Sequence, residues 1–194
     1  MSPKKLKTRQ QADPAYKWNI EAMIADESTI DEDLSKIRKA ADKYTEKYRG
    51  HLGDSAETLY KAFADKDKIM RKLEKIYVYA HMKRDEDNAD SRYQGMTDKT
   101  MGIISYVSAA FSFFTPELLS IKKKVLRQYV DENDGLKTYS FVINDALRQK
   151  KHVLSNKEEA LIAQFGEITR ATNDIFTMLN NADITFEPAT DSKG

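Results

Sequence analysis

The chain has 194 residues, with 32 Lys and Arg against 31 Asp and Glu, and a formal net charge of +1. This balance gives no electrostatic reason to expect nucleic acid or a membrane surface as a partner. Cysteine is absent, which excludes disulfides, a thiolate nucleophile and thiolate-bound zinc. The same absence fits a reducing compartment, so we expect a cytoplasmic protein. Only 7 Gly and 4 Pro occur, fewer than the turns of an all-β fold normally need.

The first segment, residues 1–18, is basic and contains Pro3 and Pro14, which favour extended backbone before them. It has no apolar core of the kind found in signal peptides. We expect an extended N-terminal arm. Four apolar residues that follow could dock this arm onto the body: Trp18, Ile20, Met23 and Ile24.

The next segments predict two strongly amphipathic helical stretches. Residues 29–49 start with Thr29 and Glu32 at the spacing of a capping box and end before Gly50, a favoured helix C-cap residue. Apolar residues recur there at helical spacing: Ile30, Leu34, Ile37, Ala41, Tyr44 and Tyr48. Ser55 opens the second stretch, in which the polar run 64–68 indicates two helices that meet at an angle.

A third helix is predicted over residues 91–114. Its small residues Gly95, Gly102 and Ala109 recur every seven positions and indicate a close neighbouring helix and a central place in a bundle. The uncharged run 100–116 is shorter than the roughly 20 apolar residues of a membrane span, so we expect a buried helix and no membrane.

The last third of the chain predicts short helices at 116–120, 121–131 and 136–150. Thr115 is expected as the N-cap of the first of these, with Pro116 at its first helical position. Ser155 and Glu158 form a second capping box for a helix that Gly166 should break. A final helix, with Ile168, Ile175 and Leu179 as an inward-facing stripe, should end near Asn181. Asp183 to Phe186 then alternates like a strand. The predicted fold is all-α, an antiparallel bundle of about seven helices with a short strand at 183–186.

No pattern in the sequence supplies a catalytic, cofactor-binding or metal-binding set. The histidines are His51, His81 and His152, and none begins the H-E-x-x-H motif of helical zinc peptidases. His81 and Asp85 could share a helix face as a solvated pair. In the acidic run 85–91, Asp85 and Asp87 fit the first ligand positions of a calcium loop, but Ala89 stands at a further ligand position and Asp90 at the position of the glycine, which favours a solvated acidic turn. There is neither a glycine-rich phosphate loop nor a G-x-S-x-G turn.

Several segments, in order along nearly the whole chain, resemble the N-terminal region of the oligoendopeptidase F family, zinc metallopeptidases related to thimet oligopeptidase. They are YKWNIEAMI (16–24), YRGHLGDSAETL (48–59), LEKIYVYAHMKRDEDNADSRYQ (73–94), SFFTPELL (112–119), HVLSNKEEALIAQ (152–164) and IFTMLNNADITF (175–186).

The resemblance implies a parent zinc metalloendopeptidase that hydrolyses oligopeptides. The family's H-E-x-x-H helix and third Glu ligand lie far C-terminal to the region resembled, so no catalytic or zinc residue is carried over. We therefore expect a fragment that is not catalytic alone: residues 1–18 as an arm, 19–182 as a helical N-terminal lobe forming one wall of the substrate cleft, and 183–194 as the truncated start of the catalytic domain. Its expected partners are the parent's C-terminal catalytic domain and an oligopeptide substrate.

Two groups of residues are candidates for the cleft or for the contact between lobes. Tyr77, Tyr79, His81 and Arg84 could face the cleft, since tyrosines offer both area and a hydroxyl, although tyrosines at helical spacing also fit a core. The second group, Asn180, Asn181 and Asp183, would lie at the hinge between lobes or form an ordinary helix cap. Exposed interface surface would also promote self-association. The alternative reading is a free-standing helical protein-interaction module.

Overall fold

A computed structural model describes residues 11–150, 154 and 156–185. This part of the chain is helical and contains no strand. The helices are α1 (Ile30–Tyr48), α2 (Ala56–Glu86), α3 (Ser91–Phe111), α4 (Phe114–Ser120), α5 (Lys123–Glu132), α6 (Asp134–Thr138), α7 (Ser140–Gln149) and α8 (Asn156–Met178). Short 3-10 turns precede α1: η2 (Pro14–Tyr16), η3 (Ile20–Ala22) and η4 (Glu27–Thr29). The expected all-α fold is confirmed.

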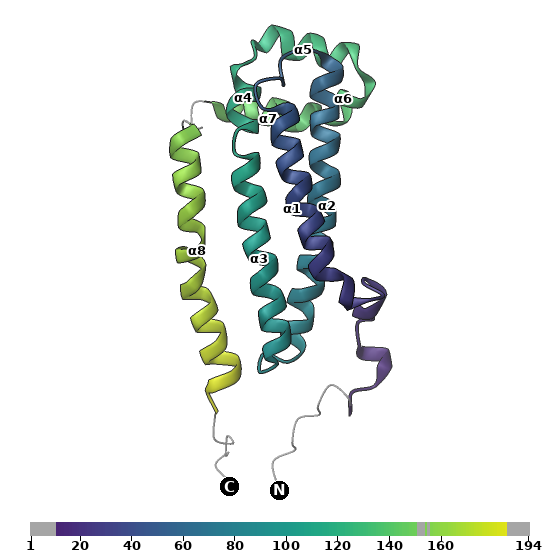
Figure 1. The fold of residues 1–194 in the computed structure, drawn as a ribbon, viewed down its shortest axis with the longest axis vertical. Helices are drawn as coiled ribbons and strands as arrows, with labels where there is room; N and C mark the ends of the chain where they lie inside the picture. The colour runs from purple at the N-terminus through teal and green to yellow at the C-terminus, as the bar shows by residue number, and fades with distance from the viewer. Residues whose placement is uncertain (1–10, 151–153, 155, 186–194) are drawn as a thin grey trace, which may run out of the picture.

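The long helices α1, α2 and α3 pack against one another along the molecule. The short helices α4 to α7 cover one end of this bundle, drawn at the top of Figure 1. Helix α8 lies along the outer side of α3. The predicted central place of α3 is therefore confirmed.

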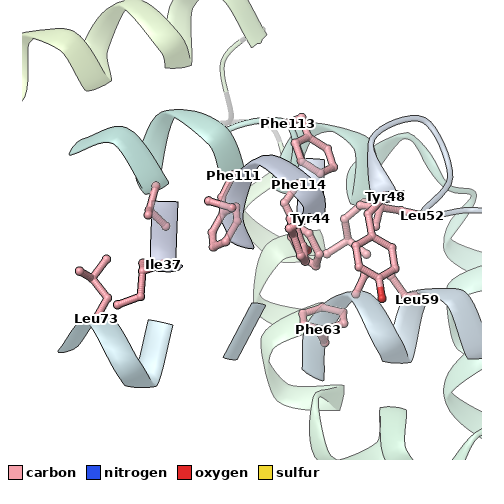
Figure 2. Packing of buried hydrophobic residues seen from close by; sticks show 14 of the residues in the cluster. Ile37, Tyr44, Tyr48, Leu52, Leu59, Phe63, Leu73, Phe111, Phe113 and Phe114 are labelled. Atoms are coloured by element: carbon pink, nitrogen blue, oxygen red, sulfur yellow. The ribbon is translucent and has the colours of Figure 1, made fainter. Parts of the chain in front are cut away.

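The core begins with the apolar stripe of α1, which is buried as the sequence predicts. Its aromatic end packs against rings from α2 and the α3–α4 junction (Figure 2). The rings of Tyr44 and Phe111 lie 4.6 Å apart, and Phe63 meets Phe114 edge-on at 4.8 Å. Such ring pairs add to the stabilisation that burial of apolar area gives.

Two expectations about helix boundaries in the first half are wrong. The Thr29 hydroxyl donates to the backbone carbonyl of Asp26 at 2.9 Å instead of capping α1, because the turn η4 precedes the helix. The polar run 64–68 does not interrupt α2. Two of its side chains contact residues of the core: the Asp65 carboxylate accepts a hydrogen bond from the Tyr48 hydroxyl at 2.7 Å, and the Lys66 ammonium lies over the ring of Phe114.

The small residues of α3 do not mediate a close approach. A Cβ added at Gly95 or Gly102 would meet nothing within 4 Å, and both positions are exposed. The buried face of α3 includes Thr97 and Thr100, whose hydroxyls donate to backbone carbonyls one turn earlier. By length and composition, residues 91–120 pass as a candidate membrane span, but a core helix of a soluble protein passes the same test.

The loop between α1 and α2 is tied to α4. Gly50 ends α1 with a φ of +85°, a left-handed conformation that favours glycine, as predicted for a C-cap. Ser55 begins α2 as expected, since its hydroxyl accepts from the Thr58 N–H at 3.0 Å. Helix α4 starts at Phe114, so Pro116 is its third residue and Thr115 is not the N-cap.

The C-terminal predictions need the most correction. Gly166 does not break α8, and a glycine inside a helix costs only about 1 kcal/mol relative to alanine. The helix does not end at Asn180 and Asn181 but continues as a π-helical turn, η6 (Leu179–Asp183), closed by a bond from Ile184 N–H to the Leu179 carbonyl at 2.9 Å.

The short strand expected at 183–186 is absent from its described residues. Asp183 belongs to η6, and Ile184 is extended but pairs with no strand among the described residues. Without a neighbouring strand, local helical bonds satisfy the backbone instead. His152, Ser155 and Phe186 lie outside the described residues, and so does the side chain of Ile168.

Candidate functional site

Tyr79, one of the residues predicted to face the cleft, belongs to the buried core. Its side chain is buried, and its hydroxyl donates to the carboxylate of Glu27 in η4. Burial, reinforced by the hydrogen bond to Glu27, raises the pKa of Tyr79 well above its usual value. Tyr79 therefore links α2 to the segment before α1.

Tyr77, His81 and Arg84 are brought together near the C-terminal end of α2. One guanidinium nitrogen of Arg84 lies 3.0 Å from Nε2 of His81, and Nδ1 of His81 lies 3.0 Å from a carboxylate oxygen of Asp85. Because an arginine only donates, Nε2 must accept and Nδ1 must carry the proton given to Asp85. The Tyr77 ring meets His81 edge-on at 5.4 Å. The predicted His81–Asp85 pair is thus present, extended by Arg84.

Asn180, Asn181 and Asp183 all lie in η6 and are exposed. The amide of Asn180 donates to the side-chain oxygen of Asn181 at 2.9 Å. This turn ends α8 at the same end of the molecule at which α2 ends (Figure 1). Among the described residues, neither a hydrogen bond nor an ion pair joins this turn to Tyr77, His81 or Arg84, so the two predicted groups share an end of the bundle without being bonded to each other.

A polar cluster that sequence reasoning missed fixes the segment before α1 to the α2–α3 hairpin. The Glu27 carboxylate accepts from the hydroxyls of Tyr79 and Tyr93, the latter at 3.1 Å, and from the guanidinium of Arg92. Separated by 52 to 66 residues, these partners leave no local pattern that would reveal them.

Lys83 makes a second link in the same region. Its ammonium is largely buried and lies 2.8 Å from a carboxylate oxygen of Glu21 and 3.3 Å from one of Glu86. Burial alone would lower the pKa of Lys83, but the two carboxylates raise it overall. A paired lysine of this kind is a structural anchor, and it holds η3 on α2.

The apolar surface of α8 is the most conspicuous exposed feature. Ile175 is 68% and Phe176 is 63% exposed. The inward stripe predicted from Ile175 and Leu179 is therefore wrong for both residues, since Leu179 is 47% exposed. Further exposed apolar side chains lie along the helix and just beyond it: Leu161, Ile162, Phe165 and Ile184. We call these seven residues the α8 face; extended apolar surface of this kind usually marks an interface.

Among the described residues, no group of three or more His, Asp or Glu side chains is arranged to hold a metal ion. The cluster around Glu27 joins η4 to α2 and α3, whereas the contacts of His81 lie within α2.

The described part of the chain is thus a helical bundle with an exposed apolar face on α8. Comparison with known proteins indicates the class of protein in which this bundle occurs. A family model described as Oligopeptidase F matches residues 117–186. The Oligopeptidase PepF of Bacillus subtilis is 37% identical over 177 residues, which are 91% of this chain and 26% of that protein. The plasmid-encoded oligoendopeptidase F of Lactococcus lactis subsp. cremoris is 32% identical over 178 residues, 92% of this chain and 30% of that protein.

Solved structures agree with the sequence relatives. The crystal structure of oligoendopeptidase-F from Enterococcus faecium superposes with a TM-score of 0.78 at 34% identity, over 86% of this chain and 32% of that one. A putative peptidase from Chlamydophila abortus shares the fold, with a TM-score of 0.65 at 22% identity. The molecule is thus similar to a helical part of known peptidases.

More narrowly, the chain is similar to members of the oligoendopeptidase F family, and the matches are consistent with the N-terminal region of that family. It spans between 26% and 32% of the length of the relatives named above.

Proposed function

We propose that this chain is the non-catalytic helical lobe of an oligoendopeptidase F-like zinc metalloendopeptidase and forms one wall of a cleft that admits oligopeptides. The supporting observation is the asymmetry of coverage. The Bacillus subtilis relative matches 91% of this chain, yet the match takes up only 26% of that protein. The catalytic part would lie in the portion of the parent protein outside the segment that this chain represents.

The α8 face is the surface that would pack against that catalytic part. Seven apolar side chains are exposed there, and among the helices α8 packs mainly against α3. Burying apolar surface yields about 25 cal/mol per Å² removed from water, which favours covering this face. In the same proposal, Asn180, Asn181 and Asp183 lie at the joint between the two parts.

Zinc is assigned to the part of the parent outside this chain. The described residues do not fit the ion, since they contain no convergent set of three His, Asp or Glu side chains. No step of peptide hydrolysis is derived from residues of this chain.

The gene provides the first test. We expect the reading frame to continue beyond Gly194 into an H-E-x-x-H helix. We also propose that the parent protein is cytoplasmic, so its gene should encode no export signal. A native stop codon directly after Gly194 would favour the alternative, a free-standing helical protein-interaction module.

Activity provides the second test. The chain, incubated with zinc and an internally quenched oligopeptide, should give no hydrolysis above that of a mock purification from cells lacking the gene. Hydrolysis that co-purifies with the chain and disappears from the mock sample would overturn the non-catalytic role.

A further inference from the structure

A groove on another face of the molecule is not used by the proposed function. It has a volume of about 550 Å³ and lies between α2 on one side and α1 with its preceding segment on the other. Roughly 300–1,000 Å³ is the range of ligand pockets. The groove is lined by apolar side chains that are only partly covered or belong to the core: Met23, Ile24, Ile37, Ile69 and Ile76. Helix α8 contributes no lining residue.

One rim of the groove is basic. Lys68, Lys72 and Lys75 line it from α2, at positions that share one helix face. Lys68 pairs with Asp65 at 3.2 Å, whereas Lys72 and Lys75 form no ion pair with any described residue. These two lysines are three residues apart, so their backbone positions are separated by about 4.5 Å along the helix axis.

The opposite rim carries carboxylates that are already engaged. Asp33 pairs with Lys36 at 3.3 Å, and the Asp26 carboxylate accepts from the Ser28 N–H at 2.9 Å, where it caps η4. That hydrogen bonding lowers the pKa of Asp26, which therefore remains ionised. The lining residues of the groove include four lysines and two aspartates, so its net charge is positive, and the lysines without an ion pair to a described residue are Lys72 and Lys75.

We propose that this groove binds an amphipathic acidic peptide segment of a partner protein. Apolar side chains of the segment would fill the space over Ile69 and Ile76. Carboxylates three or four residues apart on the same segment would pair with Lys72 and Lys75, since that spacing matches the three-residue spacing of the two lysines on α2. This inference does not depend on the proposed function, because it is argued from the lining of the groove and not from the similarity to peptidases.

A fluorescent peptide of about twelve residues tests the proposal, with Leu at helical spacing on one face and Glu at i and i+3 beside it. We expect saturable binding by fluorescence anisotropy that weakens as salt is added. The double variant Lys72→Glu, Lys75→Glu should bind it about tenfold more weakly, because two attractive pairs become repulsive. A peptide with Lys in place of each Glu should prefer the double variant over the wild type.

Matched control variants test whether the loss of peptide binding arises at the groove. The variant Lys123→Glu, Lys124→Glu makes the same change of charge on α5, outside the groove, and should bind like the wild type. Phe176→Ser on the α8 face should also leave binding unchanged, whereas Ile69→Ser should weaken it. Circular dichroism verifies that each variant is helical.

Three outcomes would overturn the proposal. The first is equal binding by the wild type and the Lys72, Lys75 variant. The second is equal weakening by the α5 control. The third is binding of anionic phosphatidylserine vesicles, lost in the Lys72, Lys75 variant, without binding of the acidic peptide, which would make the basic rim a lipid contact.

Discussion

A carboxylate oxygen of Glu117 in α4 accepts a hydrogen bond from the backbone N–H of Gly50 at 2.8 Å. The other oxygen of the same carboxylate accepts from the N–H of Leu52 at 2.9 Å. One side chain thus satisfies two loop donors that lie more than sixty residues away in sequence. It also joins two of the segments that carry the family resemblance, at 48–59 and 112–119.

Replacing Glu117 should destabilise the fold. We expect Glu117→Ala to lower the free energy of unfolding by about 1–3 kcal/mol, because two N–H groups lose a charged acceptor and that of Leu52 is partly buried. Glu117→Gln should cost less, since its amide oxygen can still accept one bond. Urea unfolding followed by circular dichroism measures both. Glu74→Ala, an exposed site on α2, serves as the control and should change stability by less than about 0.5 kcal/mol.

Substitutions of two glycines by alanine should have opposite effects on stability. Gly50→Ala should destabilise by about 1–2 kcal/mol, because a Cβ is unfavourable at a φ of +85°. Gly102→Ala should stabilise by about 0.5–1 kcal/mol, because it improves helix propensity where an added Cβ meets nothing within 4 Å. Thermal unfolding of the two variants beside the wild type is the measurement. A loss of stability in Gly102→Ala would mean that α3 has a closer neighbour there than the structure describes.

Alkaline pH should weaken the fold partly through Tyr139. Burial, with the hydrogen bond to Asp67 at 2.7 Å, raises the pKa of Tyr139 to about 12. The pKa of Tyr139 in the folded protein lies above the ordinary value of 10.0. The protonated hydroxyl therefore stabilises the folded state fully below pH 10, and this stabilisation is lost as the pH rises towards 12.

The variant Tyr139→Phe isolates that contribution. It keeps the ring stacked on Phe63 at 4.6 Å but has no proton to lose. Between pH 9 and pH 11, the urea midpoint of the wild type should therefore fall further than that of Tyr139→Phe. Parallel declines in the two proteins would contradict the assignment to this hydroxyl.

The α8 face should cause the isolated chain to self-associate. Light scattering after size exclusion should give a mass that rises with protein concentration, because contact between copies removes exposed apolar surface from water. The variant Ile175→Ser, Phe176→Ser should reduce this association. Phe141→Ser, Val142→Ser, an equally adjacent exposed pair on α7, should reduce it less. A strict monomer at high concentration would count against an interface on α8.

The helices of the first half were predictable because their cues are local. The stripe of α1, the cap at Ser55 and the left-handed Gly50 each follow from residue type and spacing within a few positions. The break predicted at 64–68 was wrong because Asp65 and Lys66 find partners on other segments, which periodicity along one helix does not reveal.

The candidate site was predictable only in part. The pair of His81 with Asp85 follows from an i, i+4 spacing, and the burial of Tyr79 agrees with a tyrosine at the helical spacing of a core. The acceptor role of Glu27 depends on partners far away in sequence. For Ile175 the error has another cause, since an amphipathic stripe predicts an apolar face but does not say what covers it.

A chimera tests the central claim most directly. In it, this chain replaces the aligned 177-residue segment of the Bacillus subtilis Oligopeptidase PepF, and hydrolysis of an internally quenched oligopeptide is measured. We expect the chimera to be clearly more active than the same relative with that segment deleted, because the helical lobe would restore the missing wall of the cleft. A chimera no more active than the deletion would contradict the assignment of this chain as the helical lobe of an oligopeptide-cleaving enzyme.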